Sequence, residues 1–227
     1  CALPLEGRRV LISADCHLSA ASALIHSGAL PLMLPPRRRR GGLPLPSAAS
    51  DVDKALRAHK DIAAVLLTSP NYYGFTADVP AIAAHCRARG IPLLVDAAHG
   101  AHFGFAPALP PQPVEADAWV VSAHKTLPVE NQGAMLFLGR DSLLDAQRLF
   151  CALSTFQTTS PSWPLLAAMD DAVFGLMARG HGDYGALLRR LRRFARALGD
   201  TPYRLIDAPR KTKDATRLVI DLSAKGL

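Results

Sequence analysis

Two stretches of the sequence decide its fold: PLLVDAAHGAHFGF at residues 92–105 and ADAWVVSAHKTLP at residues 116–128. Each contains a short run of apolar residues that is followed at once by polar ones. Runs that are apolar throughout, without alternation, are typical of strands that helices cover on both faces of a parallel sheet. In such sheets ligands bind at the carboxyl ends of the strands. The two stretches therefore predict neighbouring strands with a site where they end.

The same pattern recurs along the chain. Helices with readable ends lie between the apolar runs. Asp78 caps a helix that runs to Arg89 and stops at Gly90, and Asp51 opens another that runs through Ala58. A third helix covers residues 187–198, with Gly199 after it. The predicted strands are residues 10–13, 64–68, 92–95, 119–121 and 134–138. The sequence thus predicts an α/β fold, a mostly parallel sheet with helices on both faces.

Composition narrows the class of protein. The chain has 227 residues, of which 49% are apolar, which suits one domain with a substantial core. No apolar run approaches the ~18 residues of a membrane span, and no leader sequence is visible, so we expect no membrane and a cytoplasmic location. The four cysteines form no Cys-x-x-Cys pair, so we expect no metal site. No glycine-rich dinucleotide motif follows the first strand, which argues against a nicotinamide enzyme.

The net charge of +7 raises the question of nucleic-acid binding. One basic run, Arg37 to Arg40, is followed by glycines and prolines and reads as a solvated loop. A second, between Arg189 and Arg196, lies on the polar side of the helix at residues 187–198. We expect no nucleic-acid partner.

Asp96 and Lys125 are the residues of greatest chemical interest. Asp96 directly follows the apolar run LLV, and Lys125 follows the strand candidate in WVVSAHK. Pyridoxal phosphate needs a lysine that holds it as a Schiff base and an acid that keeps its ring nitrogen protonated. A carboxylate ~4 Å from that nitrogen gains about 4 kcal/mol at an effective dielectric of about 20. Taken singly, Asp96 also fits a turn or helix cap, and Lys125 an ordinary surface lysine.

The sequence motifs around these two residues resolve this ambiguity. TSPNYYGFTADVPAIAAHCRARGIPLLVDAAHGAHFGF at residues 68–105, ADAWVVSAHKTLP and FQTTSPSW at residues 156–163 closely resemble the major domain of the ornithine/lysine/arginine decarboxylase class-I family. These are pyridoxal-phosphate enzymes of fold type I, the aspartate-aminotransferase-like fold. The likeness runs from about residue 7 to residue 162. The chain departs from the family words at Asn71, where threonine is common, at Ala97, where an acidic residue is usual, and at Glu130.

The resemblance implies a role for each matching position. Lys125 would carry the Schiff base and Asp96 would face the pyridine nitrogen. His17, in ADCHLS, would stack on the ring, although it also fits an exposed loop histidine. The other implied cofactor contacts are Ala98 under the ring, Ser122 and His124 at the phosphate, and Thr68.

Four further residues are candidates for contact with the substrate or with a second subunit. His99 is as well explained by hydrogen bonds that hold its loop, and the same applies to His102 of the same word. Tyr72 is interpreted as pocket wall, with core packing as the alternative. Thr159 and Ser160 lie in a serine-rich word that, in family dimers, reaches the neighbouring subunit's pocket; that word also fits a helix start capped by Ser162.

The resemblance implies decarboxylation of ornithine, lysine or arginine to an amine and carbon dioxide by a homodimer with shared active sites. Another pyridoxal-phosphate reaction (an aminotransferase or lyase) and an inactive remnant stay open. We expect residues 1–200 to form a cofactor-binding large domain that lacks an upstream phosphate loop. Residues 201–227 would be a linker or the start of a small domain, in which ATRLVIDLS at residues 215–223 reads as a strand.

Overall fold

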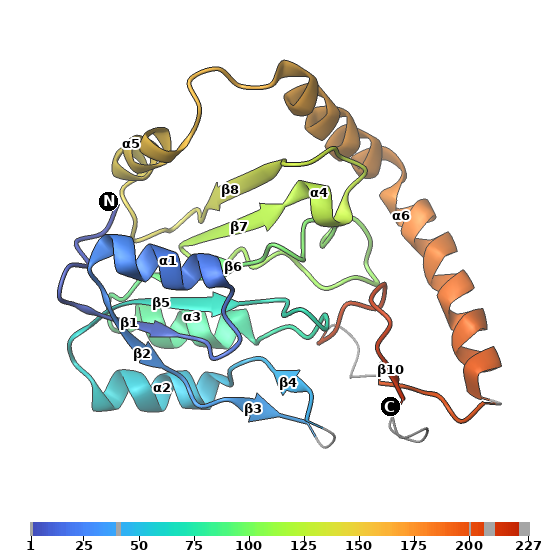
Figure 1. Ribbon diagram of the computed structural model, residues 1–227, viewed down its shortest axis with the longest axis horizontal. Helices are drawn as coiled ribbons and strands as arrows, with labels where there is room; N and C mark the ends of the chain where they lie inside the picture. The colour runs from blue at the N-terminus through green and yellow to red at the C-terminus, as the bar shows by residue number, and fades with distance from the viewer. Residues whose placement is uncertain (1, 40–41, 200, 207–211, 223–227) are drawn as a thin grey trace.

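The computed structural model describes residues 2–39, 42–199, 201–206 and 212–222, and its centre is a six-stranded sheet (Figure 1). The strand order is β2-β1-β5-β6-β7-β8, and every neighbouring pair is parallel except β7 with β8. These strands are β1 (Arg9–Ile12), β2 (Leu30–Met33), β5 (Ile62–Thr68), β6 (Leu93–Asp96), β7 (Ala118–Ser122) and β8 (Ala134–Leu138).

Six helices and two short hairpins complete the described part of the chain. The helices are α1 (Leu18–Ser27), α2 (Ala49–Ala58), α3 (Val79–Arg87), α4 (Ala123–Thr126), α5 (Ala146–Phe156) and α6 (Trp163–Gly199). The hairpins pair β3 (Arg37–Arg38) with β4 (Pro44–Leu45), and β9 (Arg204–Leu205) with β10 (Ile220–Asp221). The basic run is therefore not simply a loop, because Arg37 and Arg38 form an exposed strand.

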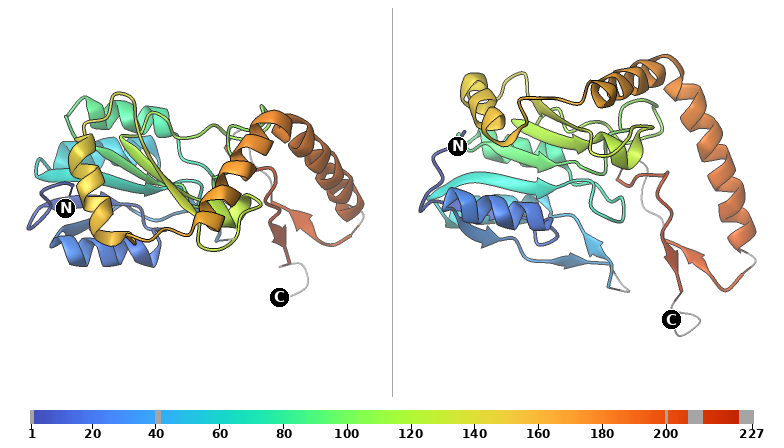
Figure 2. Two further views of the ribbon diagram at one scale, coloured as in Figure 1. Left: turned by 90° about the horizontal axis from the view of Figure 1, so that it is seen from above. Right: turned by 45° about the horizontal axis from the view of Figure 1, so that its top comes forward.

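Both faces of the sheet carry helices, as predicted. Successive side chains of a strand point to opposite faces, and β1 shows the division. Leu11 belongs to the larger buried cluster, which includes side chains of α2 and α3. Val10 and Ile12 belong to a second cluster that includes Leu24 of α1. Figures 1 and 2 show α1 lying across the opposite face of the sheet from α2 and α3.

The five strands predicted at residues 10–138 match the structure to within two residues at each end, and residues 134–138 match without change, whereas β2 was not predicted. The start of α3 is also as predicted, because the Asp78 carboxylate accepts a hydrogen bond from the Ala81 N–H at 3.2 Å. The helix ends at Arg87 rather than Arg89, and Gly90 follows with a φ of 63°. Helix α2 begins at Ala49, two residues before Asp51, which lies in the first turn where a carboxylate stabilises the helix dipole.

Two predictions near the end of the chain were wrong in extent. The helix at residues 187–198 is only the last part of α6, which has 37 residues and includes Gly199. It passes beside the carboxyl ends of the parallel strands, and the chain then turns back toward the sheet (Figure 2). The strand expected at residues 215–223 is limited to Ile220–Asp221, and residue 223 lies outside the described ranges. None of the helices described is both long and apolar enough to cross a membrane.

Two leucines test how much the two-sided burial contributes. Leu93 of β6 is fully buried, whereas Leu30 of β2 is 51% exposed. Leu93→Ala should lower the free energy of unfolding by about 2–5 kcal/mol because it leaves a cavity between sheet and helices. Leu30→Ala should cost less than about 1 kcal/mol. Urea denaturation of both variants measures this; equal losses would contradict the assignment of the core.

Candidate functional site

The polar strand ends meet at one edge of the sheet. Thr68 of β5 is paired with Asp96 of β6, and Asp96 with Val120 of β7. After β1, the Ser13 hydroxyl accepts a hydrogen bond from the Thr68 N–H at 3.2 Å. After β7, the Ser122 N–H donates to the Ala98 carbonyl at 3.3 Å. The structure thus brings together candidates from β5, β6 and β7 at the edge where β1 also ends.

Asp96 also closes the turn that follows β6. Its Oδ1 accepts a hydrogen bond from the Ala98 N–H at 3.0 Å. The turn-cap interpretation of Asp96 is therefore correct as geometry. It does not exclude a second role, because a carboxylate has acceptor positions on both oxygens.

The charges at this edge converge on His99. Burial, followed by the positive charges of Lys125 and Arg217, lowers the pKa of its ring to about 4, while the negative charge of Asp96 opposes them. His17 is a smaller cause in the same direction as the cations. Because charge interactions fall off with distance, these groups lie around one ring although they come from four separate parts of the chain.

Lys125 and its neighbours form the short helix α4. The Lys125 side chain is exposed, so its amine is accessible from solvent. The His124 Nδ1 lies 2.8 Å from the Gly133 carbonyl; since a carbonyl only accepts, this nitrogen carries hydrogen and Nε2 is left for other partners. The Ser122 side chain makes no hydrogen bond to the helix that it precedes.

His17 occupies a position that neither sequence interpretation foresaw. It is the N-cap of α1, and its Nδ1 accepts a hydrogen bond from the Ser19 N–H at 3.2 Å. Its ring is nevertheless exposed, at the end of β1 beside the other strand ends.

Tyr72 is 69% exposed, which excludes core packing. Its ring meets that of His99 edge to face, with centroids 5.8 Å apart. Thr159 and Ser160, in contrast, are exposed in the linker between α5 and α6, and no described contact joins them to the strand ends. The helix expected after Ser162 does begin at Trp163.

Two buried oxygens near this edge suit a site for a polar ligand. Asp15 Oδ2 and Thr126 Oγ1 have no hydrogen-bond partner among the residues that the structure describes. Burial raises the pKa of Asp15, opposed by hydrogen bonds from Ser13 and Asn71. Buried polar atoms normally have partners, and one added molecule or chain segment would supply them.

Comparison with known proteins assigns the chain to a family. The sequence profile of the family described as "Orn/Lys/Arg decarboxylase, major domain" matches residues 2–184. The chain belongs to this family. An arginine decarboxylase from Halalkalibacterium halodurans is 34% identical over 177 residues, which are 77% of this chain and 36% of that protein. The chain spans about a third of the length of the curated relatives that it matches.

Solved structures of this decarboxylase family and beyond share the fold. The constitutive lysine decarboxylase of E. coli has a TM-score of 0.70 at 18% identity, over 94% of this chain and 33% of that one. A PLP-bound putative aminotransferase from Clostridium difficile 630 has a TM-score of 0.70 at 14% identity, over 100% of this chain and 59% of that one. At these identities the likeness shows the fold, that of fold type I pyridoxal-phosphate enzymes.

The motifs shared with the family do not include every residue near the site. Arg217 lies beyond the matched residues, and its distance in sequence hid its proximity to His99. Asp15 lies within ADCHLS, but nothing in the sequence distinguishes this aspartate from an ordinary surface aspartate. Asn71, a departure from the family words, is 1% exposed, and its Oδ1 accepts hydrogen bonds from the Tyr73 and Phe75 N–H groups. It therefore shapes the loop after β5.

The lowered pKa of His99 predicts a pH dependence of stability. Between the ordinary value of 6.5 and about 4, the unfolded chain binds a proton that the folded chain does not, so stability falls as the pH falls. His99→Gln should reduce the loss between pH 7 and pH 5 by roughly 1 kcal/mol, a figure discounted for the half-exposed ring. Urea denaturation at both pH values measures it. The control, His26→Gln, changes an exposed histidine of α1 and should behave like the unmodified chain.

Proposed function

We propose that this chain binds pyridoxal phosphate through Lys125 and belongs to an enzyme that decarboxylates ornithine, lysine or arginine to an amine and carbon dioxide. The observation that carries the proposal is the convergence of Lys125 and Asp96 on one strand-end site in a chain of the decarboxylase family. The relatives named arginine decarboxylase and lysine decarboxylase support the substrate class.

The residues present fit the cofactor. Lys125 offers an exposed amine for covalent attachment, and Asp96 offers a carboxylate to the pyridine nitrogen. Ser122 and His124 would bind the phosphate, Thr68 would contact the cofactor, Ala98 would pack under the ring and His17 over it. When bound, pyridoxal phosphate withdraws electrons from the α-carbon of the substrate. The unpaired oxygen of Thr126 supports a polar ligand here, because its hydroxyl is buried beside Lys125.

The local geometry prepares several of these groups for their proposed roles. The Ala98 N–H holds the Asp96 side chain, which limits the rotamers that must be frozen on binding. The Gly133 carbonyl holds the His124 ring through its Nδ1–H, so that Nε2 would donate to a phosphate oxygen when the ring is protonated. His99 and Tyr72 would line the substrate side, and the Lys125 amine would carry protons to and from the substrate.

A second pyridoxal-phosphate reaction is the competing proposal, because the putative aminotransferase is as similar in fold as the lysine decarboxylase. Product analysis separates the two reactions. An amine with carbon dioxide supports decarboxylation, and a keto acid supports transamination.

Lys125→Ala tests the cofactor assignment. Titration of the chain with pyridoxal phosphate should produce the visible absorbance of a lysine-bound cofactor, and the variant should lose it completely. Lys54→Ala, a control in α2 far from Lys125 in sequence, should keep it. An absorbance that survives Lys125→Ala would refute the proposal, as would its absence from the unmodified chain.

We further propose a cytoplasmic homodimer that supplies amines for polyamine biosynthesis, with residues 1–200 as the cofactor domain and residues 201–227 opening a small domain or linker. Large apolar side chains flank the Thr159–Ser160 word and support a subunit interface. Phe150, Phe156, Trp163 and Phe174 are each more than 60% exposed.

Mixing two inactive variants tests the shared site. Lys125→Ala lacks the lysine, and a Thr159→Ala, Ser160→Ala double variant lacks the residues proposed to cross the interface. A 1:1 mixture that exchanges subunits should recover about a quarter of the activity, because half of the dimers then contain one intact site of two. Size-exclusion chromatography with light scattering checks the dimer. No recovery upon proven exchange would exclude a site that crosses the interface.

A further inference from the structure

A segment from beyond the family match reaches the candidate site. Residues 212–217, here called the C-terminal strap, return from α6 to the loop after β5 (Figure 1). The Thr76 N–H donates to the Thr212 carbonyl at 3.0 Å, and the Asp214 N–H donates to the Gly74 carbonyl at 2.7 Å. Phe75 and Lys213 form an antiparallel bridge between these two bonds. The strap is therefore attached through its backbone to a site loop.

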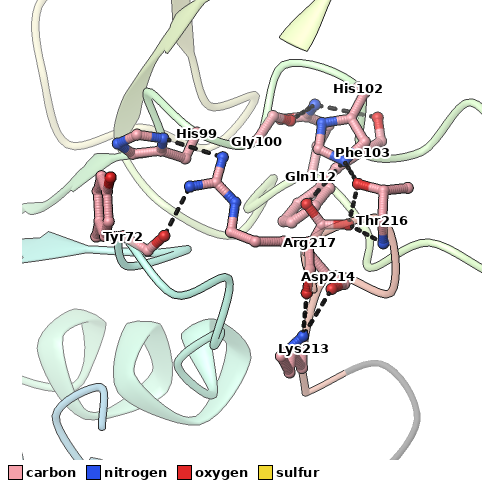
Figure 3. A network of polar contacts seen from close by, with 10 residues as sticks. All are labelled: Tyr72, His99, Gly100, His102, Phe103, Gln112, Lys213, Asp214, Thr216 and Arg217. Carbon is pink, nitrogen blue, oxygen red and sulfur yellow. Dashed lines mark hydrogen bonds and ion pairs between the residues drawn. The ribbon is translucent and has the colours of Figure 1, made fainter. Parts of the chain in front are cut away.

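A buried contact between His102 and Asp214 anchors the strap. His102 Nε2 lies 3.0 Å from Asp214 Oδ2, and both side chains are 2% exposed (Figure 3). The Thr216 hydroxyl donates to Asp214 Oδ1 at 2.6 Å, and the Thr216 N–H donates to the same oxygen at 2.8 Å. Burial raises the pKa of Asp214, but the hydrogen bond and charge of His102 outweigh it and leave the pKa below its usual value. Asp214 is thus held as a carboxylate with partners on both oxygens.

Gly74 permits the close approach of the strap. Its φ is 85°, a conformation that other residues adopt rarely. A Cβ at this position would lie 3.2 Å from the Cβ atoms of both Asp214 and Arg217. The loop after β5 therefore accommodates the strap where a side chain would push it away.

The anchored strap directs Arg217 at His99. One guanidinium nitrogen donates to the Tyr72 carbonyl at 2.6 Å, and the other lies 3.3 Å from Nδ1 of His99 (Figure 3). The guanidinium also lies over the Tyr72 ring, 5.9 Å from its centroid. A guanidinium has only donors, so Nδ1 must accept, and the hydrogen of a neutral ring must then be on Nε2.

We propose that Arg217 is a positioning residue of the site: anchored through the strap by Asp214 and His102, it keeps the His99 ring neutral with its hydrogen on Nε2. The charged or titratable groups around that ring are Lys125, Arg217, His17, Asp96 and the phenol of Tyr72. A neutral His99 ring does not compete as a cation for the Asp96 carboxylate, which stays free for the pyridine nitrogen. The same ring offers its Nε2–H as a donor to an oxygen of the substrate or cofactor. This role within a decarboxylase site rests on the proposed function, whereas the state of the ring does not.

Nitrogen-15 NMR of the histidine rings in the cofactor-free chain tests the proposal, with His99→Gln to assign the signals. The His99 ring should be in the Nε2–H form at pH 7 and titrate with a pKa of about 4. Arg217→Met should raise the pKa by roughly one unit, because a like charge within hydrogen-bond distance disfavours protonation. Arg217→Lys, which keeps the charge, should raise it less. Arg204→Met, a control at an exposed arginine of β9, should change nothing. An Nδ1–H ring in the unmodified chain, or no response to Arg217→Met, overturns the proposal.

Asp214→Asn tests the anchor by the sign of its effect. Removal of a negative charge would by itself lower the pKa of His99, whereas release of the strap withdraws Arg217 and raises it. We expect a rise; a fall or no change means that the strap does not position Arg217. Thr216→Val is the milder variant if Asp214→Asn fails to fold, as judged by circular dichroism, and should give a smaller rise.

The two proposals fail separately. In active enzyme, Arg217→Met should shift the acid limb of the pH profile of kcat/KM toward higher pH, by as much as the pKa of His99 rises. A His99 ring that responds as expected in a chain without the Lys125-dependent absorbance refutes only the proposed function. A normal absorbance with an unresponsive ring refutes only the role of Arg217.

Discussion

The rest of the structure depends on the two-sided burial of the parallel strands. In β5, Val65 and Leu67 pack into the cluster with α2 and α3, while Ala64 packs on the other face. A shift of one residue would exchange these faces, so the packing determines the register. Since the strands are parallel and in register, their carboxyl ends form one edge. Thr68, Asp96 and Ser122 are neighbours there as a consequence of burial elsewhere.

Two aspartates on these strands show how position decides the chemistry of one residue type. Asp117, just before β7, is 4% exposed and accepts hydrogen bonds from the Leu93 and Leu143 N–H groups at 2.7 and 2.6 Å. Its oxygens are committed to the opposite edge of the sheet. Asp96 is less buried and has one backbone partner in the described structure. The Asp96 carboxylate therefore retains acceptor capacity at the edge where the charges converge, as a ligand-binding group requires.

Electrostatics at the site combine like and unlike charges within one network. Lys125 and Arg217 act on His99 in the same direction, and Asp96 opposes them. Bringing two cations near one half-buried ring is unfavourable unless contacts elsewhere hold them there. The buried His102–Asp214 pair supplies such contacts for Arg217, and α4 supplies the backbone position of Lys125. The motif at residues 68–105 therefore contributes both to the candidate site at the strand ends and to the anchoring of a segment more than 100 residues away.

The sequence by itself determined the α/β fold, five of the six strands of the main sheet to within two residues, the cap at Asp78, the family, and Asp96 and Lys125 as residues of interest, because each of these follows from local pattern or from ordered sequence motifs. It did not determine that α6 is one helix of 37 residues, because its glycines read locally as ends. Gly180 is instead a close-contact position, where a Cβ would lie 3.1 Å from that of Phe105. The interpretation of His102 as a loop-holding residue was one of two open alternatives, and its hydrogen-bonded partner Asp214 was not foreseen. Only the tertiary structure decided the place of Arg217 and Asp214, because contacts between distant segments arise from packing and leave no periodic signal in either segment alone.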